Sequence, residues 1–416
     1  MSKVRNIPKD WKLSTIGKLL KISTGNQDTQ NKIKDGKYPF FVRSNIVEKL
    51  DSYSFDGEAV LTAGDGVGVG KVYHYYNGKF AFHQRVYAIY GFNQIINGKY
   101  FYRYFSENFL TEVERYSAKN SVDSVRLNMI LDMELFLPPI KEQEKIAEIL
   151  SEVDSAIEHA QALHVKHQKV KTALMQDLLT HGIDSNGKIR NPKTHAYKPS
   201  PLGDIPVEWN TDKLKNIASI IVSNVDKKSF NNEIHVKLCN YMDIYSNTYI
   251  TNTISFMNAT ATNAEIRNFQ LTQDDVVVTK DSESPFDIGI PAYILTNVEN
   301  LICGYHLAIL RTQKDILLGS WLSSILTIDY YKNYFASTAS GSTRFGLPKS
   351  ALENILVKFP NSKEEQQKIA QILSSYDEKI EKVKTKLEKL QQLKTALMQD
   401  LLNGTKRVNH LLGEEQ

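Results

Sequence analysis

Nine residues, KTALMQDLL, occur twice in this chain, at Lys171–Leu179 and again at Lys394–Leu402. The repetition extends upstream, because residues 142–179 and 365–402 align without a gap and are identical at 22 of 38 positions. Such a run of identical residues at a fixed offset indicates an internal duplication. The fold must therefore accommodate two copies of one unit.

Weaker matches begin each half of the chain. Ile7-Pro8 and Trp11 recur as Ile205-Pro206 and Trp209, whereas the segments between each tryptophan and the following repeat share almost no identity. This pattern predicts two domains that have diverged, each followed by a helix that has not. We expect a first domain at 1–140, a first helix at 141–180, a linker at 181–204, a second domain at 205–360, a second helix at 361–404 and a C-terminal tail at 405–416.

The helices are predicted from the spacing of apolar residues, which recur at steps of four and three as in a coiled-coil seam. In the second repeat the seam residues are Ile369, Leu373, Tyr376, Ile380, Val383, Leu387 and Leu390. Ser362 and Glu365 have the spacing of a capping box, and Asn403-Gly404 is typical of a helix end. In the first repeat His164 and His167 occupy two seam positions, which we interpret as partly exposed histidines rather than as a ligand pair.

Composition narrows the class of protein. A length of 416 residues suggests two or more domains, and 41% hydrophobic with 24% charged residues is ordinary for a globular protein. No apolar stretch approaches the length of a membrane span, and Cys239 and Cys303 are too few for a zinc site or a disulfide framework. We therefore expect a cytoplasmic protein with no membrane contact and no metal site. Residues 1–140 hold 19 basic against 14 acidic residues and residues 205–360 hold 13 against 15, so only the first domain has a basic excess that favours nucleic acid.

Taken together, these motifs resemble the specificity subunits of type I restriction-modification systems. The resemblance rests on IPxxW at the start of each half, on EQxKIAxIL and KTALMQDLL at the two ends of each helix, and on SPLGDIPVEW at Ser200–Trp209. It covers nearly the whole chain. The resemblance implies an α+β (mixed α/β) fold of two tandem target recognition domains, each followed by a long helix, with the two helices pairing as an antiparallel coiled coil.

The resemblance also implies a function. Each domain would read one half of an asymmetric, bipartite site in double-stranded DNA, and the chain itself would be non-catalytic. It would recruit two methylation subunits and the restriction subunits, which are ATP-dependent translocases and nucleases. S-adenosylmethionine, ATP and Mg are then expected only in those partner subunits, with no cofactor in this chain.

The glycine-rich stretch Leu61–Lys71 could suggest a phosphate-binding loop. A Walker loop requires Gly-Lys followed by Ser or Thr, whereas Lys71 is followed by Val72. The residues after Gly70 predict a strand, a turn at Asn77-Gly78 and a second strand at Phe80–Tyr90 instead of a helix. We interpret the loop as one whose backbone approaches DNA closely, because glycine adds no steric bulk. A tight hairpin without a ligand is the alternative.

Side chains near this loop suit base recognition. On the predicted strand Phe80–Tyr90, His83 and Arg85 lie on the polar face. Arginine pairs with guanine in the major groove, and Gln84 could pair with adenine. In the second domain His306 stands where Arg85 does, which predicts a different base preference.

A second patch precedes each helix, at Lys119–Asn128 and at Ser337–Gly346. The two patches share a Ser-x-Arg core, and hydroxyl groups with an arginine suit contact with phosphate. A solvated turn is the alternative. The residues predicted to bind DNA are Gly64, Asp65, Gly66, Gly68, Lys71, His83, Gln84, Arg85, Ser124, Arg126, Lys280, Ser282, Ser284, His306, Ser342, Thr343 and Arg344.

The KTALMQDLL segments carry apolar residues that we expect to bind a partner subunit, namely Leu174, Leu178, Leu397 and Leu401. We find no motif of a DNA amino-methyltransferase, a nuclease or a zinc hydrolase. Two other functions remain open at this level. One is a nucleotide-dependent enzyme that uses the Gly64–Lys71 loop, and the other is a coiled-coil scaffold with no nucleic-acid role.

Overall fold

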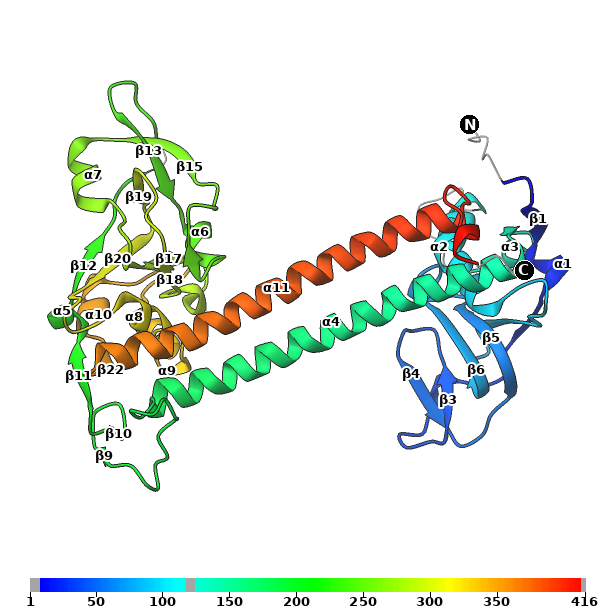
Figure 1. Cartoon of the computed structure of the whole chain (residues 1–416), viewed down its shortest axis with the longest axis horizontal. Helices are drawn as coiled ribbons and strands as arrows, with labels where there is room; N and C mark the ends of the chain where they lie inside the picture. Colours follow the sequence, from blue (N-terminus) through cyan, green and yellow to red (C-terminus); the bar gives the residue numbers. More distant parts are fainter. Residues whose placement is uncertain (1–7, 117–123, 227, 413–416) are drawn as a thin grey trace. The chain divides into compact units, whose positions relative to one another are not determined.

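The structure, a computed structural model, describes residues 8–116, 124–226 and 228–412. The chain divides into two compact units: unit 1 comprises residues 1–163 and 383–416, and unit 2 comprises residues 164–382. Each unit contains one globular domain together with part of each long helix (Figure 1). The expected mixed α/β architecture, with two domains that are each followed by a long helix, is confirmed.

The domain of unit 1 is built on a six-stranded sheet in the order β2-β7-β5-β6-β3-β4. Its strands are β2 (Lys21–Thr24), β3 (Tyr38–Phe41), β4 (Val47–Leu50), β5 (Phe55–Ala63), β6 (Tyr73–Phe82) and β7 (Val86–Tyr90). The other elements are β1 (Lys12–Thr15), α1 (Ile16–Leu19), η1 (Thr29–Asn31), η2 (Gly66–Gly68), α2 (Gly98–Tyr116), α3 (Leu127–Leu131) and β8 (Glu134–Leu137). Helix α2 packs on β5 and β6 and buries Phe101, Phe105 and Phe109 in the core. Strand β1 pairs with β8, which leads directly into the first long helix.

The domain of unit 2 has a five-stranded sheet in the order β12-β20-β16-β18-β14 and a separate three-stranded sheet in the order β15-β13-β19. Its strands are β9 (Tyr197–Lys198), β10 (Ile205–Pro206), β11 (Trp209–Lys213), β12 (Ala218–Val222), β13 (Ile234–Cys239), β14 (Tyr249–Ile250), β15 (Met257–Ala261), β16 (Val276–Thr279), β17 (Asp281–Ser282), β18 (Pro291–Ile294), β19 (Leu301–Cys303), β20 (Leu307–Thr312), β21 (Phe345–Gly346) and β22 (Leu356–Pro360). Its helices are α5 (Leu214–Ile217), α6 (Tyr241–Tyr245), α7 (Asn263–Phe269), η3 (Pro285–Asp287), α8 (Gly319–Ile325), α9 (Asp329–Thr338) and α10 (Lys349–Asn354). Strand β11 pairs with β22 just before the second long helix, as β1 pairs with β8 before the first.

The two domains share a framework of four strands. The neighbours β2-β7-β5-β6 in unit 1 correspond to β12-β20-β16-β18 in unit 2, and neighbouring strands in both sets are antiparallel. The domains differ in the segment between the first strand of this framework and its second strand in the chain. In unit 1 the β3-β4 hairpin between β2 and β5 joins the main sheet. In unit 2 the longer segment between β12 and β16 contributes β14 to the main sheet, while its strands β13 and β15 form a separate sheet with β19. The duplication therefore extends into the domains, where sequence identity has almost vanished.

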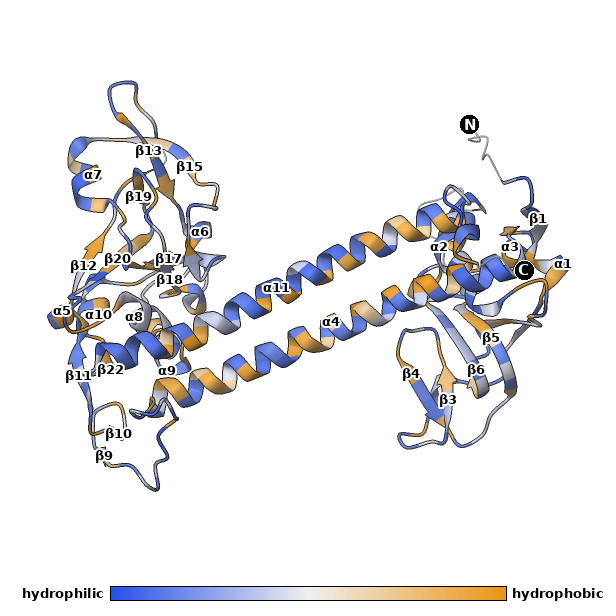
Figure 2. Cartoon of the chain, viewed as in Figure 1, coloured by the Kyte–Doolittle hydropathy of each residue, from blue (hydrophilic) through white to orange (hydrophobic). Residues whose placement is uncertain are grey.

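The long helices are α4 (Ile140–His181) and α11 (Lys363–Leu402), with a final turn η4 (Asn409–Leu411) after them. They run antiparallel in unit 2, where the end of α4 lies beside the start of α11 and Lys171 pairs with Asp377 further along. In unit 1 the equivalent pair is Lys394 and Asp154, at 2.7 Å. Apolar and polar residues alternate along both helices (Figure 2). Among the described residues no helix is both long and apolar enough to cross a membrane.

The expected seam is confirmed by burial. Ile369 and Leu373 are buried, and the other five seam positions of α11 are half-buried, as suits a two-helix pair that water reaches from both sides. His164 and His167 on α4 are half-buried in the same way. In the part of the chain that the structure describes, no three His, Cys, Asp or Glu side chains are grouped to hold a metal ion.

A buried glutamate anchors the start of each long helix. In unit 2 Glu365 accepts hydrogen bonds from the indole of Trp209 at 3.2 Å and from Arg190 at 2.5 and 2.9 Å. The capping box expected at Ser362 is therefore only half formed. The Ser362 hydroxyl accepts from the Glu365 amide at 3.2 Å, but the glutamate carboxylate turns to the arginine and tryptophan instead of back to the serine.

Unit 1 repeats this anchor with residues from the opposite end of the chain. Glu142 accepts from Trp11 at 3.1 Å and from Arg407 at 2.7 and 2.8 Å. Gly404, predicted as the end of the helix, has φ +71°, and the equivalent Gly182 has φ +65°. The tail after α11 therefore supplies the arginine of this anchor in unit 1, and the linker after α4 supplies it in unit 2.

Candidate nucleic-acid interface

In unit 1 one carboxylate holds two arginines just beyond the end of β5. Asp65 accepts a hydrogen bond from Nη1 of Arg43 at 2.8 Å and another from Nη1 of Arg85 at 2.5 Å. The aspartate side chain is only 16% exposed, whereas the two arginine side chains are 42% and 61% exposed. Nε and Nη2 of both arginines donate to none of the described residues. Both guanidinium groups are thus held in place with donors left for a ligand.

In unit 2 a chemically different cluster surrounds Asp281, just beyond the end of β16. Its carboxylate lies 2.9 Å from Nδ1 of His306 and 3.0 Å from Nζ of Lys280. With Nδ1 of His306 donating to the carboxylate, Nε2 accepts from Nη2 of Arg344 at 3.0 Å. One carboxylate therefore gathers a lysine, a histidine and, through the histidine, an arginine.

Backbone hydrogen bonds show that these clusters occupy equivalent places. The Gly64 amide donates to the Arg85 carbonyl at 2.8 Å, and the Lys280 amide donates to the His306 carbonyl at 2.8 Å. Gly64 and Lys280 each precede the central aspartate. The alignment of His306 with Arg85 is confirmed, and the aspartate is shared while the basic groups around it differ.

The central carboxyl groups remain ionised because of their partners. Burial alone would raise the pKa of Asp65, but hydrogen bonds from Arg43 and Arg85 outweigh it and hold the pKa below its ordinary value. Burial likewise opposes ionisation of Asp281, and the hydrogen bonds from His306 and Lys280 lower its pKa. Both carboxylates therefore act as fixed negative charges that orient cations.

The glycine loop connects β5 to β6 and contains the single turn η2. Gly64 and Gly68 are buried, and a Cβ on Gly68 would lie 2.5 Å from the carbonyl oxygen of Arg43. These two glycines allow the loop to pack on its own domain, and their contact with DNA stays a prediction. Gly66 and Lys71 are exposed. The loop leads into a strand and not into a helix, so its amides do not form the helix N-terminus on which a phosphate-binding loop depends.

Two local predictions after the loop are wrong. Strand β6 runs unbroken through Asn77-Gly78, which faces Gly57 and Glu58 of β5, so no turn lies there. The turn comes later, where the Val86 amide donates to the His83 carbonyl at 2.9 Å and divides the expected strand Phe80–Tyr90. The asparagine and glycine are instead accommodated in the strand, with Gly78 at φ +140°.

This turn decides which of its side chains face water. His83 is 3% exposed and its Nδ1 accepts from the Arg85 amide at 2.9 Å, so His83 shapes the turn, and its contact with DNA stays a prediction. Gln84 and Arg85 are exposed at the tip. In unit 2 Ser282 and Ser284 shape the loop after β16, because the Ser284 hydroxyl accepts from the Phe286 amide at 3.3 Å and the Ser282 hydroxyl accepts from the Ser284 amide at 3.3 Å.

The second patch is not equivalent in the two units. Val125 donates to the Gly64 carbonyl at 2.7 Å as Leu347 donates to the Lys280 carbonyl at 2.8 Å, so Arg126 corresponds to the residue after Leu347 and not to Arg344. The alignment of the two Ser-x-Arg cores is therefore wrong. Residues 119–123 of the first patch lie outside the described residues. The residues of this patch that were predicted to bind DNA are all exposed, namely Ser124, Arg126, Ser342, Thr343 and Arg344.

The four leucines expected to bind a partner are used inside the units. Leu178 and Leu401 are 1% and 4% exposed, within the cores that contain Trp209 and Trp11 respectively. Leu174 and Leu397 pack against the same cores. Leu178 and Leu401 each secure the end of a helix to a domain, and a role for the four leucines in partner binding stays a prediction.

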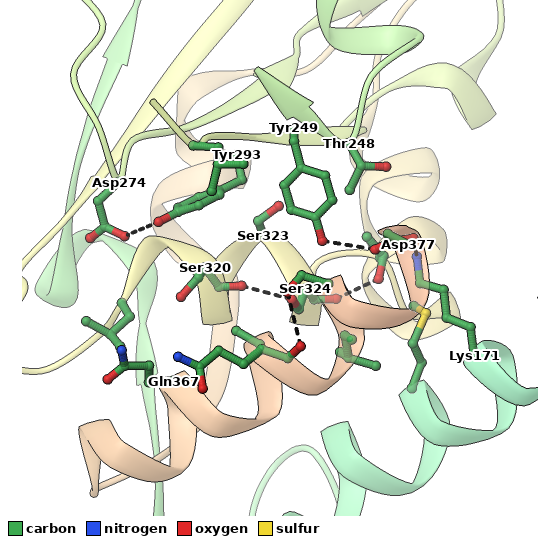
Figure 3. Close-up of a pocket in the computed structure, with 18 of the residues that line it drawn as sticks. Lys171, Thr248, Tyr249, Asp274, Tyr293, Ser320, Ser323, Ser324, Gln367 and Asp377 are labelled. Atoms are coloured by element: carbon green, nitrogen blue, oxygen red, sulfur yellow. Dashed lines mark hydrogen bonds and ion pairs between the residues drawn. The ribbon is translucent and has the colours of Figure 1, made fainter. Parts of the chain in front are cut away.

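An open helix face lies beside each helix start instead. In unit 2 it borders a cavity of about 590 Å³, whose lining includes Tyr249, Tyr293 and Gln367 (Figure 3). The Tyr249 hydroxyl donates to Asp377 at 2.9 Å. In unit 1 the corresponding stretch of α4, with Glu144, Ala147, Glu148 and Ser151, lines a groove of about 620 Å³. We call these the helix-start grooves.

Comparison with known proteins places both halves in one group. Residues 8–167 and 206–392 each match the family described as the type I restriction modification DNA specificity domain. The chain is 29% identical over 249 residues to the type I restriction enzyme EcoDI specificity subunit of Escherichia coli, a match that covers 55% of this chain and 54% of that protein. It is 24% identical to the MjaVIII specificity subunit of Methanocaldococcus jannaschii over 97% of this chain and 95% of that one.

Among solved structures, the fold is similar to the S subunit of a type I restriction-modification system from M. genitalium. The TM-score is 0.63, with 16% identity, over 97% of this chain and 98% of that one. The match to the Escherichia coli relative spans about half the length of that protein, whereas the match to the M. genitalium S subunit spans nearly the full length of that subunit.

Proposed function

The chain belongs to the family of type I restriction-modification DNA specificity domains, and from this premise we propose that each unit reads one half of a bipartite, asymmetric DNA sequence. The observation that carries the proposal is the pair of clusters around Asp65 and Asp281. They stand at equivalent places on equivalent strands, yet one presents two arginines and the other a lysine, a histidine and an arginine. Equivalent position with different chemistry is what reading two different half-sites requires.

The proposed reading mode is direct contact in the major groove. Arginine donates two hydrogen bonds to O6 and N7 of guanine, and a guanidinium that is already oriented loses less freedom when it binds. Arg43 and Arg85 meet both conditions, and we assign guanine recognition to them in the half-site of unit 1. The nucleotide-dependent enzyme and the scaffold without nucleic acid find no comparable support.

We further propose that this chain is non-catalytic and recruits two copies of a methylation subunit, one per unit, and restriction subunits to that assembly. The repeated helices support two copies, because each unit presents a similar helix start, an equivalent anchoring glutamate and a helix-start groove. S-adenosylmethionine, ATP and Mg would then act in the partner subunits. We assign the docking of the methylation subunits to the helix-start grooves.

The test is to express the chain with a methylation subunit and to map the methylated bases on random-sequence DNA. The expected motif has two different short halves separated by a fixed gap. A single short motif, or methylation without any sequence preference, would contradict the proposal. The matched comparison is a chain in which unit 1 carries Arg85→Ala, which should alter one half of the motif and leave the other as it was.

A further inference from the structure

One loop in each unit contains a turn of 3-10 helix whose central residue presents an apolar side chain to solvent. In unit 1 the turn is η2, and the side chain of Val67 at its centre is 96% exposed. In unit 2 the turn is η3, and Phe286 at its centre is 76% exposed. A single exposed apolar residue needs no explanation. An exposed apolar residue at the same place in two loops of almost unrelated sequence does need an explanation.

The two turns occupy equivalent loops. One connects β5 to β6 and the other connects β16 to β18, which are corresponding strands of the shared framework. Both loops close on a glycine with positive φ, Gly70 at +65° and Gly289 at +76°. A Cβ at these positions would come within 2.6 Å of Leu110 and 2.1 Å of Phe335, so each glycine seats its loop on a helix of its domain. The apolar tips are therefore placed by the fold.

Hydrogen bonds hold each turn in shape. In unit 1 the Val69 amide donates to the Gly66 carbonyl at 3.1 Å. In unit 2 the Thr279 hydroxyl donates to the Asp287 carbonyl at 2.9 Å, and the Ser284 hydroxyl caps the turn. A fixed turn presents its side chain with little loss of conformational freedom on binding.

The central aspartate of each basic cluster lies in the same loop as the apolar tip of that unit. Val67 follows Asp65 by two residues, which span at most about 7 Å, and that distance is about two base-pair steps along B-DNA. In a major groove lined by hydrogen-bonding base edges, the C5-methyl group of thymine is the apolar feature that a Val or Phe side chain can contact. Cytosine and the purines offer no such methyl group at their major-groove edges.

We propose that Val67 and Phe286 each contact the C5-methyl group of a thymine, one in each half-site. This proposal rests on the proposed function and names part of what each unit reads. The clusters around Asp65 and Asp281 supply hydrogen bonds to neighbouring bases, and the apolar tips distinguish thymine from cytosine and from uracil.

The experiment uses the reconstituted complex of the full chain with its methylation subunit and DNA duplexes that carry its mapped target. Each thymine of both half-sites is replaced in turn by deoxyuridine, which removes only the C5-methyl group. Binding should weaken about fourfold at one position in each half-site, the loss expected when one buried methyl group is removed.

Two variants complete the test and serve as controls for each other. In the Val67→Ser complex, the deoxyuridine effect should disappear in the half-site of unit 1 and persist in the other, and Phe286→Ser should show the reverse. Persistence of both effects in both variants would overturn the assignment of these residues.

The remaining outcomes also separate the two levels of the proposal. Specific binding of the bipartite target with no sensitivity to deoxyuridine would overturn the thymine contact and leave the proposed function intact. Absence of any sequence preference would overturn both. A rise in 2-aminopurine fluorescence beside the contacted base would show that the tip wedges between base pairs, and it would overturn a contact confined to the methyl group.

Discussion

Arg407 and Glu142 lie 265 positions apart and are joined in unit 1 by hydrogen bonds of 2.7 and 2.8 Å. Arg190 and Glu365 form the same pair in unit 2. Arg407 follows the second long helix and Glu142 begins the first, whereas Arg190 follows the first and Glu365 begins the second. The segment after each helix therefore supplies the arginine that binds the glutamate at the start of the other helix. The hydrogen bond to Glu142 raises the pKa of Arg407, which therefore stays charged throughout the accessible pH range.

Replacing Arg407 by alanine should destabilise unit 1. The Glu142 side chain is 1% exposed. Removal of its arginine leaves a buried carboxylate that, among the described residues, accepts hydrogen bonds from Trp11 and, with the Asn409 amide group rotated, from Asn409. Breaking a buried pair in this way costs about 3 kcal/mol. In thermal unfolding, the transition of unit 1 should move to a lower temperature. Lys406→Ala is the matched control, because Lys406 forms an ion pair with Asp400 at the protein surface. A loss of Tm in this control as large as that of Arg407→Ala would contradict the role of the buried glutamate.

Asp10 gives this pair a pH dependence. Its hydrogen bond with Arg407 lowers the pKa of Asp10 below the ordinary value of 3.8. A carboxyl group whose pKa is lower in the folded state stabilises the fold above the unfolded-state value, and loses that effect as pH falls through the folded-state pKa. Asp10→Asn should therefore cost about 1 kcal/mol or less at pH 7, and the cost should fade below about pH 4. Urea unfolding of both proteins at pH 7, 5 and 3 measures this, and a cost that grows towards pH 3 would contradict it.

The helices were predictable because their signal is local and repeated. Seam residues at steps of three and four, a serine at the helix start and a glycine at the helix end act within a few residues of one another. The capping box failed where a distant partner intervened. Nothing near Glu365 in the chain indicates that Arg190, 175 positions away, would take its carboxylate.

The site was harder to predict for the same reason. Arg85 was identified because base-reading arginines have a known chemistry, but Arg43 was missed, since its link to Asp65 exists only when β3 lies beside β6. The Asn77-Gly78 turn failed because strand β5 places Gly57 opposite, so the pair fits within the sheet. In each case a non-local contact overrode a local preference.

Charge-conserving variants test guanine recognition in unit 1. Arg43→Lys and Arg85→Lys keep the positive charge but lose the planar fork that binds two acceptors. Each should reduce discrimination at one base pair of the first half-site by about 1–3 kcal/mol, with an unchanged salt dependence. Binding of the complex to targets with single base-pair changes provides the measurement.

Two controls frame this result. Arg344→Lys should affect only the second half-site. Arg126→Ala, if it removes a phosphate contact, should lower affinity for every sequence and reduce the salt slope by about one. Loss of discrimination in both half-sites from Arg43→Lys would show that the two units do not read independently.

The helix-start grooves predict how assembly can be blocked one copy at a time. Ser151 lies in the groove of unit 1 and Ser374, its counterpart in the repeat, lines the cavity of unit 2. Replacing either by arginine places a long, charged side chain where a partner would pack. Native mass measurement should then show one methylation subunit instead of two, and none for the double variant. Two bound subunits in the double variant, with helical content unchanged, would locate docking elsewhere.

The paired helices should set the gap between the two half-sites. In unit 1 Asp154 faces Lys394, and this antiparallel register places Leu163 opposite Thr385, so seven residues inserted after each keep the seam in phase. The insertion adds about 10 Å of helix at 1.5 Å per residue. If the helix axis lies along the DNA, the unread gap should lengthen by about three base pairs at 3.4 Å each, and by fewer if it is inclined. The bases read in each half should stay the same, because neither domain is altered. Methylation of targets with graded gaps measures this, and a preferred gap equal to that of the parent would show that the helices do not set the spacing.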